Sequence, residues 1–164
     1  MKRKLLTLGI KIAIIFVSIF VLFVLIFRFV RVSTNAMAPN VMGGDLALIY
    51  RLDKKYEVGD VVTFKRDGKR YFLRVIAVDS GVVSIHDGMF FINDVPEDSS
   101  HAFIGDFIDN PANYEAPFPY VVTPGTVFVA GDNRDEDNDS RTFGAISVDE
   151  IDGKVISIMR TRGV

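Results

Sequence analysis

A run of 23 mostly apolar residues near the N-terminus, from Leu5 to Phe27, limits what this chain can fold into more than any other feature. At a rise of 1.5 Å per residue, a helix of this length spans roughly 30 Å, which is the thickness of the hydrocarbon core of a bilayer. A helix that is apolar on all faces needs either the interior of a large protein or a membrane. Because the whole chain has only 164 residues, we expect residues 5–27 to form a single transmembrane helix.

A cleavable signal peptide is the alternative, because the basic residues at positions 2–4 precede the apolar run. The apolar region of a signal peptide is usually about 7 to 15 residues long and ends in small side chains. Here bulky side chains continue to Phe27, and Arg28 follows. Four basic residues lie before the centre of the run and two follow it, at Arg28 and Arg31, which favours a cytoplasmic N-terminus. We therefore expect a single-pass protein of the cell membrane, with a cytoplasmic tip at residues 1–4 and an extracytoplasmic domain at residues 28–164.

The part of the chain beyond the expected anchor is acidic. Six of the 19 Lys and Arg residues lie at or before Arg31, which leaves 13 against 21 Asp and Glu, an excess of eight negative charges. Nucleic-acid-binding domains carry a basic patch, so this balance argues against nucleic acid as a partner. It also argues against an outer domain that lies flat on anionic lipid. The chain has no cysteine, which excludes disulfides and thiol chemistry.

Short runs rich in Val, Ile, Phe and Tyr, separated by Gly, Asp and Pro, predict a mostly β outer domain. Asp87 and Gly88 separate two of these runs at the spacing of a two-residue hairpin turn. The segment from Asn93 to Gly125 contains five of the six prolines and predicts a long excursion, of a kind that is usually functional or mobile. The expected strands are residues 46–50, 61–64, 71–78, 82–85, 89–92, 126–130 and 154–159.

Two short motifs flank these strands. The first contains Met37 and Pro39, followed by Gly44 and Asp45. The residues of the second motif are Gly131, Asp132, Asn133, Arg134, Asp139, Ser140 and Arg141. Together, the two motifs resemble the signature boxes of bacterial type I signal peptidases, a family of membrane serine peptidases. The resemblance implies an antiparallel, coiled barrel-like β fold behind one N-terminal transmembrane helix, with no cofactor. We expect a structural role for the second motif.

The positions to which the resemblance assigns the chemistry hold the wrong residues for it. The family's Ser-Met-x-Pro element puts the nucleophilic serine before Met37, where this chain has Ala36. The family's Lys-Arg-Val-Ile run aligns with residues 73–76 and puts Leu73 at the position of the general-base lysine. The serine that helps to orient this lysine aligns with Asp137. Because alanine cannot attack a carbonyl and leucine cannot accept a proton, we expect no nucleophilic catalysis here.

Neighbouring polar side chains do not replace the missing pair. Ser33 is about 10 Å from position 36 along an extended chain, and Lys69 is displaced by roughly 13 Å from position 73 along a strand. Thr34 lies where the family tends to place a hydroxyl of the oxyanion hole, so it could still bind a carbonyl group. His86 and His101 have no Ser-His-acid pattern around them, and we expect them to be surface or packing residues.

The acidic run at residues 135–139 begins like a calcium-binding EF-hand loop. Positions six and twelve of such a loop would be Ser140 and Ile146, where the loop requires Gly and Glu. We therefore predict no metal site. Asp139 and Arg141 are instead expected to form an ion pair. Asp132 and Asn133 are expected to cap turns beneath the groove in which the family's peptidases hold their substrate.

Peptide binding without cleavage is the function that these observations favour. Signal peptidases hold substrate as an added strand beside segments that correspond here to residues 33–36 and 71–76, and main-chain hydrogen bonding does not require the catalytic pair. Similar signal-peptidase-like proteins, encoded beside pilin genes in some Gram-positive bacteria, are implied to assist pilus polymerisation by sortase as chaperones. We expect peptide or pilin clients, with sortase as a candidate partner. The expected binding residues are Thr34, Met37, Pro39, Tyr71 and Val75.

Two other functions stay open at this stage. The first is an active signal peptidase I, a serine endopeptidase that removes signal peptides from secreted preproteins. The second is an assembly scaffold whose groove is closed by its own long excursion and whose partners bind elsewhere, through the acidic surface.

Overall fold

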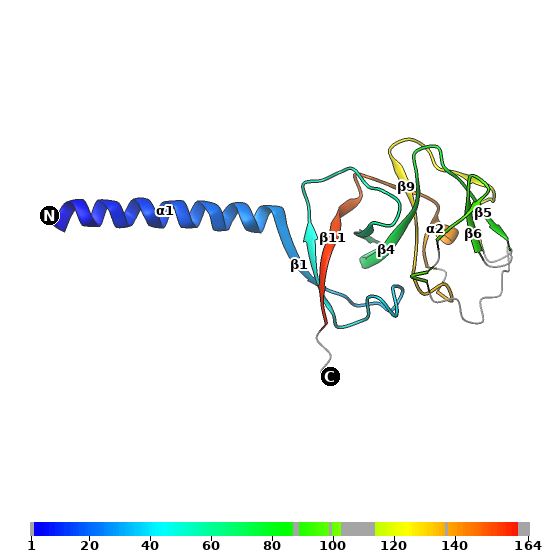
Figure 1. Ribbon diagram of the computed structural model, residues 1–164, viewed down its shortest axis with the longest axis horizontal. Coiled ribbons are helices and arrows are strands. Elements are labelled where there is room, and N and C mark those ends of the chain that lie inside the picture. The colour runs from blue at the N-terminus through cyan, green and yellow to red at the C-terminus, as the bar shows by residue number, and fades with distance from the viewer. Residues whose placement is uncertain (1, 87–88, 99, 103–113, 137, 161–164) are drawn as a thin grey trace.

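The computed structural model describes residues 2–86, 89–98, 100–102, 114–136 and 138–160. Helix α1 (Lys2–Ile26) projects from one end of a β domain (Figure 1). Its segment Leu6–Ile26 is, within these described ranges, the one helix that is long and apolar enough to cross a membrane. The helix was predicted to end at Phe27. It ends one residue earlier.

The end of α1 is fixed by the strands that follow it. Arg51 donates its backbone N–H to the Ile26 carbonyl at 3.0 Å, which satisfies one of the acceptors that a helix end leaves free. Strand β1 (Phe27–Arg31) starts at the next residue and pairs in antiparallel register with β2 (Leu46–Tyr50). The Phe27 ring lies between those of Phe23 and Tyr50, with centroids 4.9 and 5.6 Å away. Aromatic packing therefore joins the helix to the sheet.

The larger sheet has seven strands in the order β1-β2-β11-β3-β4-β9-β10, and all neighbours are antiparallel. Irregularities in the pairing occur in β11 and in β4, and such bulges increase the local twist of a sheet. The backbone of Gly153 in β11 lies so close to the Tyr50 carbonyl that there is no room for a side chain. The strands not yet given bounds are β3 (Val61–Arg66), β4 (Lys69–Val78), β9 (Thr126–Ala130), β10 (Ile146–Ser147) and β11 (Ile151–Met159).

A smaller four-stranded sheet lies at the end of the domain away from α1 (Figure 1). Its order is β7-β6-β5-β8, again antiparallel. Its strands are β5 (Val82–His86), β6 (Met89–Ile92), β7 (Val95–Pro96) and β8 (Tyr120–Val121). A single turn of helix, α2 (Ser140–Phe143), follows β9. The predicted mostly antiparallel β fold is confirmed.

Strand β4 runs through the middle of the buried core. Its Leu73 and Val75 belong to one hydrophobic cluster and Phe72 to a second. Ile76 and Ala77 belong to a third, which underlies the smaller sheet. The alternation of Phe72 and Leu73 between clusters follows from the two-residue period of a strand. A strand buried on both faces explains why residues 71–78 are almost continuously apolar.

All seven predicted strands are present, and their bounds differ from the prediction by at most a few residues. The prediction missed β1, β7, β8, β10 and the short α2. The excursion from Asn93 to Gly125 is not devoid of strands, because it contributes β7 and β8 to the smaller sheet. The predicted turn at Asp87 and Gly88 lies outside the described residues, although β5 and β6 on either side of it pair as a hairpin.

Candidate functional site

The two positions at which the sequence predicted a missing catalytic pair belong to one buried hydrophobic cluster. Leu73 is fully buried and Ala36 is 8% exposed. The remaining members of this cluster are Tyr56, Val62, Phe64, Val75, Val127, Val129, Ile146 and Ile151. The environment of both positions is therefore apolar, with one buried hydroxyl, that of Tyr56.

A close backbone contact holds Ala36 beside the second motif. The Ala36 carbonyl accepts a hydrogen bond from the Asn133 N–H at 2.9 Å. A Cβ atom on Gly131 would lie 2.5 Å from the same carbonyl oxygen, so only glycine fits there. Gly131 directly follows Ala130, which pairs with Arg74 in the sheet. This contact is what brings the segment at position 36 to the strand that carries position 73.

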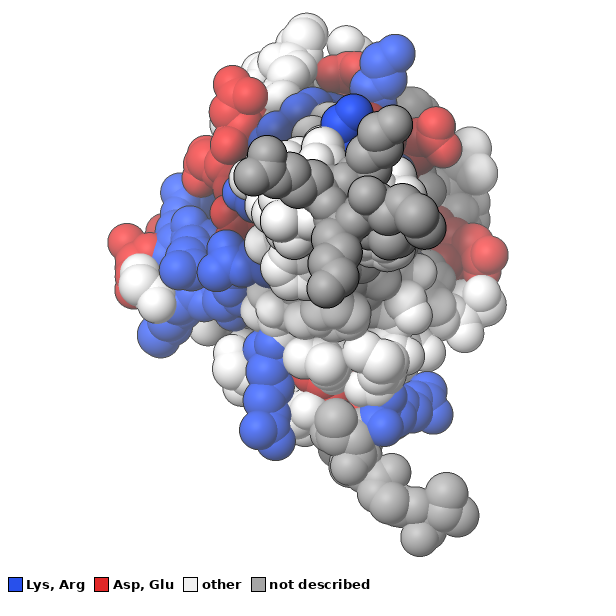
Figure 2. All heavy atoms as spheres, turned by 90° about the vertical axis from the view of Figure 1, so that its left-hand side faces the viewer, with Lys and Arg blue, Asp and Glu red and all other residues white. Residues whose placement is uncertain are grey.

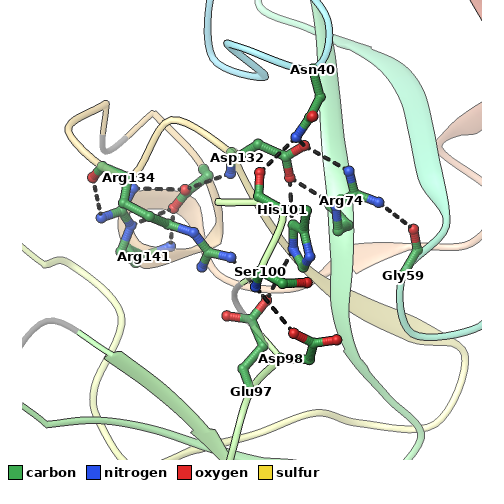
Figure 3. Close-up of polar contacts among 12 residues, drawn as sticks. Asn40, Gly59, Arg74, Glu97, Asp98, Ser100, His101, Asp132, Arg134 and Arg141 are labelled. Atoms are coloured by element: carbon green, nitrogen blue, oxygen red, sulfur yellow. Dashed lines mark hydrogen bonds and ion pairs between the residues drawn. The ribbon is translucent and has the colours of Figure 1, made fainter. Parts of the chain in front are cut away.

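Asp132 is the centre of a buried polar network (Figure 3). Its carboxylate, with a side chain that is 0% exposed, accepts two hydrogen bonds from the Arg74 guanidinium at 2.7 and 2.6 Å. It also accepts one from the Asn40 side-chain amide at 2.9 Å, while Arg74 donates to the Gly59 carbonyl at 2.8 Å. A bidentate Arg–carboxylate pair of this kind fixes orientation as well as supplying energy. The prediction that Asp132 caps a turn differs from this finding, since the residue joins three segments instead.

Asp139 and Arg141 form the predicted ion pair, and both are buried. Asp139 is the N-cap of α2, and its carboxylate accepts from the Gly131 N–H at 3.1 Å and from the Arg141 side chain at 2.9 Å. Arg141 in turn donates to the carbonyls of Arg134 and Glu136. Burial alone would lower the pKa of Arg141, but the charge and hydrogen bonds of Asp139, together with Tyr114, raise it. The guanidinium therefore stays charged and holds the loop that carries Gly131.

Sequence reasoning missed a second set of polar contacts on the same network. Arg134 is almost fully buried, stacks over the Phe90 ring with its guanidinium carbon 4.7 Å from the centroid, and donates to Glu97 at 2.8 Å. The imidazole Nε2 of His101 lies 3.6 Å from Glu97 and 3.8 Å from Asp132. His101 was expected to be an isolated surface or packing residue. Its half-buried position beside two carboxylates shows that it belongs to the site.

One side of β4 near Ala36 has no paired strand among the residues that the structure describes. Strand β4 pairs with β3 along Lys69–Arg74, but its pairing with β9 starts only at Arg74. In the described ranges, residues 69–73 thus have a paired strand on one side only. Phe72 and Leu73 are nevertheless fully buried, so the accessible part of this edge is residues 69–71. Tyr71 on this edge and Thr34, two residues before Ala36, are predicted binding residues, and both are partly exposed. The arrangement can accept an extended peptide as an added strand.

The other predicted binding residues are less suited to direct contact. Pro39 is exposed, but Met37 and Val75 are buried. The backbone groups of Val75 are also occupied, because its N–H donates to Asp60 and its carbonyl accepts from Gly59. Residues 74–76 therefore cannot form part of an open edge. Phe72 and Leu73 are fully buried as well, so the segment predicted at 71–76 shortens to Tyr71, which is partly exposed.

The third position of the missing catalytic arrangement, Asp137, lies outside the described residues. Ser140 does not offer a free nucleophile, because it is buried and its hydroxyl oxygen accepts from the Val129 N–H at 2.9 Å. Ser33 is exposed to solvent. The described part of the chain contains no group of three or more His, Asp or Glu side chains that could hold a metal ion.

The described residues thus form an antiparallel β domain behind an apolar N-terminal helix, with a buried Arg–Asp pair beside Ala36. Comparison with known proteins identifies the family. A family model described as signal peptidase, peptidase S26, matches residues 5–160. The chain belongs to this family.

Several relatives and one solved structure agree with this assignment. The chain is 28% identical to proteins named inactive signal peptidase IA from Staphylococcus aureus, over 88% of this chain and 86% of theirs. It is also 28% identical to thylakoidal processing peptidase 1 from Arabidopsis thaliana, over 76% of this chain but only 39% of that longer protein. The crystal structure of a signal peptidase I from Enterococcus faecalis superposes with a TM-score of 0.50 at 28% identity, covering 63% of this chain and 97% of that one.

Proposed function

We propose that this protein is a membrane-anchored member of the signal peptidase family that binds extended peptide segments and does not cleave them. Helix α1 is the membrane anchor in this proposal, with its N-terminus in the cytoplasm and the β domain outside the cell membrane. The clients are secreted or surface proteins, pilin subunits among them, and sortase is a candidate partner in their assembly.

One observation carries the loss of catalysis. The nucleophile and general-base positions are occupied by Ala36 and Leu73, and both side chains pack into the same hydrophobic cluster. Nucleophilic catalysis needs an activated oxygen or sulfur beside a proton acceptor, and neither residue supplies one. The S. aureus relatives that match over most of their length are themselves named inactive.

Peptide binding is supported by what the molecule retains. Among the described residues, no second strand pairs with β4 at residues 69–73, and residues 69–71 are accessible there. Leu73 of this strand shares a cluster with Ala36, whose carbonyl accepts from the Asn133 N–H. Main-chain hydrogen bonds along such an edge give affinity, and adjoining side-chain pockets give specificity. Thr34 lies in the same segment as Ala36 and is partly exposed, so its hydroxyl can donate to a client carbonyl.

The test of lost catalysis uses the full-length protein in detergent with a secretory preprotein. We expect no shortened product with the natural sequence. Specific cleavage that disappears in Ser33→Ala or Thr34→Val would overturn the proposal.

An active peptidase is the second candidate, and it is favoured by family membership and by the name of the Arabidopsis relative. The double variant Ala36→Ser with Leu73→Lys separates the two functions. Because position 73 is fully buried, desolvation would lower the pKa of the new lysine and keep a proton-accepting amine available. Cleavage gained by the double variant, with none in either single variant, would show that the groove still accepts a peptide in a productive register. Adding Asp137→Ser tests whether the third position limits that gain.

Binding itself is measured by photo-crosslinking. A photoreactive residue at position 34 should form an adduct with a bound client peptide, whereas the same residue at Thr123, which is exposed and lies outside the groove, should not. Thr34→Val should weaken the affinity by roughly two- to tenfold, the loss that follows from one hydrogen bond. Equal amounts of adduct at positions 34 and 123 would contradict peptide binding beside Thr34.

A further inference from the structure

A cavity of about 560 Å³ lies where α1 meets the β domain. Most of its wall is apolar and comes from the last two turns of the helix and the start of β1. Two arginines complete the lining, Arg28 from β1 and Arg51 from the chain after β2. The full set of lining residues is Phe20, Phe23, Val24, Leu25, Phe27, Arg28, Phe29 and Arg51.

The position of this cavity along the chain is significant. The segment able to cross a membrane ends at Ile26, so the cavity extends from apolar helix surface to the first residues beyond it. Phe29, which is half exposed, continues the apolar wall into the β domain. In a bilayer this level is the boundary between acyl chains and headgroups.

The two guanidinium groups are available for an anion. Both side chains are exposed, and within the described residues neither belongs to an ion pair with a carboxylate. Arg51 makes one long hydrogen bond, of 3.4 Å, to the Leu25 carbonyl at the helix end. That leaves most of its five N–H donors unused. Figure 2, which looks along α1 onto the β domain, shows Lys and Arg side chains gathered on one flank of the helix base.

We propose that this cavity binds an anionic phospholipid from the surrounding leaflet, with its phosphate between Arg28 and Arg51 and an acyl chain along Phe20, Phe23 and Val24. The apolar wall and the paired guanidinium groups match the two ends of such a molecule, because arginine recognises phosphate oxygens through paired N–H donors. The inference rests on the proposed membrane anchor. It adds a ligand and an orientation to that anchor, since a lipid held at this point limits rotation of the β domain over the membrane.

The absence of tryptophan from the chain allows a direct test in the full-length protein. A Phe29→Trp reporter is placed in bilayers of phosphatidylcholine and phosphatidylglycerol in equal amounts, with bromine on the acyl chains of one lipid or the other. Bromine quenches tryptophan fluorescence on contact. We expect brominated phosphatidylglycerol to quench the reporter more strongly than brominated phosphatidylcholine. A Phe16→Trp reporter in the middle of α1, away from the cavity, should show no preference.

Removing the arginines should remove the preference. Each basic residue at a membrane surface contributes about 1 kcal/mol, or a factor of about five, to attraction of anionic lipid. Arg28→Gln should therefore lower the local enrichment of phosphatidylglycerol about fivefold, and adding Arg51→Gln should lower it further. Lys55→Gln with Lys65→Gln, which removes the same charge from exposed residues outside the cavity, should leave it unchanged. The single Arg28→Gln variant is the cleaner test of lipid binding, because replacing Arg51 also removes its hydrogen bond to the Leu25 carbonyl.

Each failure has a different meaning. If neither lipid quenches the Phe16→Trp reporter, the helix is not in the bilayer and the proposed anchor itself is wrong. If both lipids quench that reporter while the Phe29→Trp reporter shows no preference, only the lipid site is wrong. A preference that survives Arg28→Gln, or that inorganic phosphate at constant ionic strength abolishes, would also overturn a site built for a whole phospholipid.

Discussion

On one side of the candidate site Ala36 and Leu73 lie in an apolar cluster, whereas on the other side Asp132 and Arg74 form a buried ion pair tied to Asn40. The first side holds the two positions that the sequence motifs assign to the catalytic pair, and both side chains there are apolar. The second side has no chemical step to perform, and its hydrogen bonds are complete around Asp132.

The difference shows that the catalytic positions and the buried ion pair tolerate substitution differently. A catalytic pair can be replaced by apolar residues at little cost, because this removes buried polar groups together with their need for partners. An ion pair that joins three chain segments cannot lose one member without leaving a buried charge. The hydrogen bonds around Gly131 and Asp132 therefore hold these chain segments together without any catalytic pair.

The largest effect is expected from Asp132→Asn. It removes a charge that is fully buried opposite Arg74, and loss of one member of a buried pair typically costs about 3 kcal/mol or more. The free energy of unfolding of the full-length protein, from urea denaturation followed by circular dichroism in detergent, measures the loss. Asp152→Asn is a matched control. Asp152 pairs with Arg70, which lies on β4 like Arg74, but the Asp152 side chain is 37% exposed. The control should lose less than about 1 kcal/mol, and equal losses would mean that burial does not set the value of these pairs.

A smaller effect is expected from Gly131→Ala. The new methyl group would meet the Ala36 carbonyl at 2.5 Å, and overpacking against backbone costs about 1 to 3 kcal/mol. Because the Ala36 segment is one wall of the proposed peptide site, adducts from the position 34 crosslinker should decrease as well. Gly43→Ala is the comparison, since its nearest neighbour is the end of the Asn35 side chain at 3.3 Å. A Gly131 variant with unchanged stability and crosslinking would separate the second motif from the groove.

The sequence predicted the parts of the fold that depend on local pattern. Val- and Ile-rich runs marked seven strands, because alternation and β-branching are read within a few residues. Strand β1 was not predicted, because Phe27 was assigned to the helix and the four residues after it, two of them arginines, do not mark a strand without their pairing with β2. The two-residue strands β7, β8 and β10 likewise depend on their partners. Whether such short segments form strands is determined by tertiary contacts and not by their local sequence.

At the site, motif spacing located Ala36, Leu73 and Asp132, but it did not indicate Glu97 or His101. These two residues come from the proline-rich excursion, which carries no motif, and they reach Arg134 and Asp132 only through the fold. The acidic net charge likewise did not indicate where basic side chains gather on the surface of the domain. It averages over the domain, whereas Figure 2 shows basic side chains concentrated beside the helix.

The smallest effect concerns Tyr56, the one phenol in the apolar cluster of Ala36 and Leu73. Its hydroxyl is buried without a hydrogen-bond partner among the described residues. Burial, assisted by Asp53, Asp60 and Asp152, raises the pKa of Tyr56 from 10.0 to about 12. At neutral pH, Tyr56→Phe should change the free energy of unfolding by less than about 1 kcal/mol, because an unpartnered hydroxyl contributes little.

The pH dependence is where Tyr56→Phe should differ from the natural sequence. Between pH 10 and about 12 the unfolded tyrosine loses its proton while the folded one keeps it. The unfolded state then binds fewer protons, so stability that is fully present below pH 10 is lost as the pH rises through this window. Urea denaturation at a series of pH values should show a shallower decline for Tyr56→Phe. Asp53→Asn should narrow the window only slightly, because burial is the larger cause of the shift. Identical declines in the natural sequence and Tyr56→Phe would mean that water reaches the phenol, and that the cluster around Ala36 and Leu73 is less apolar than its packing indicates.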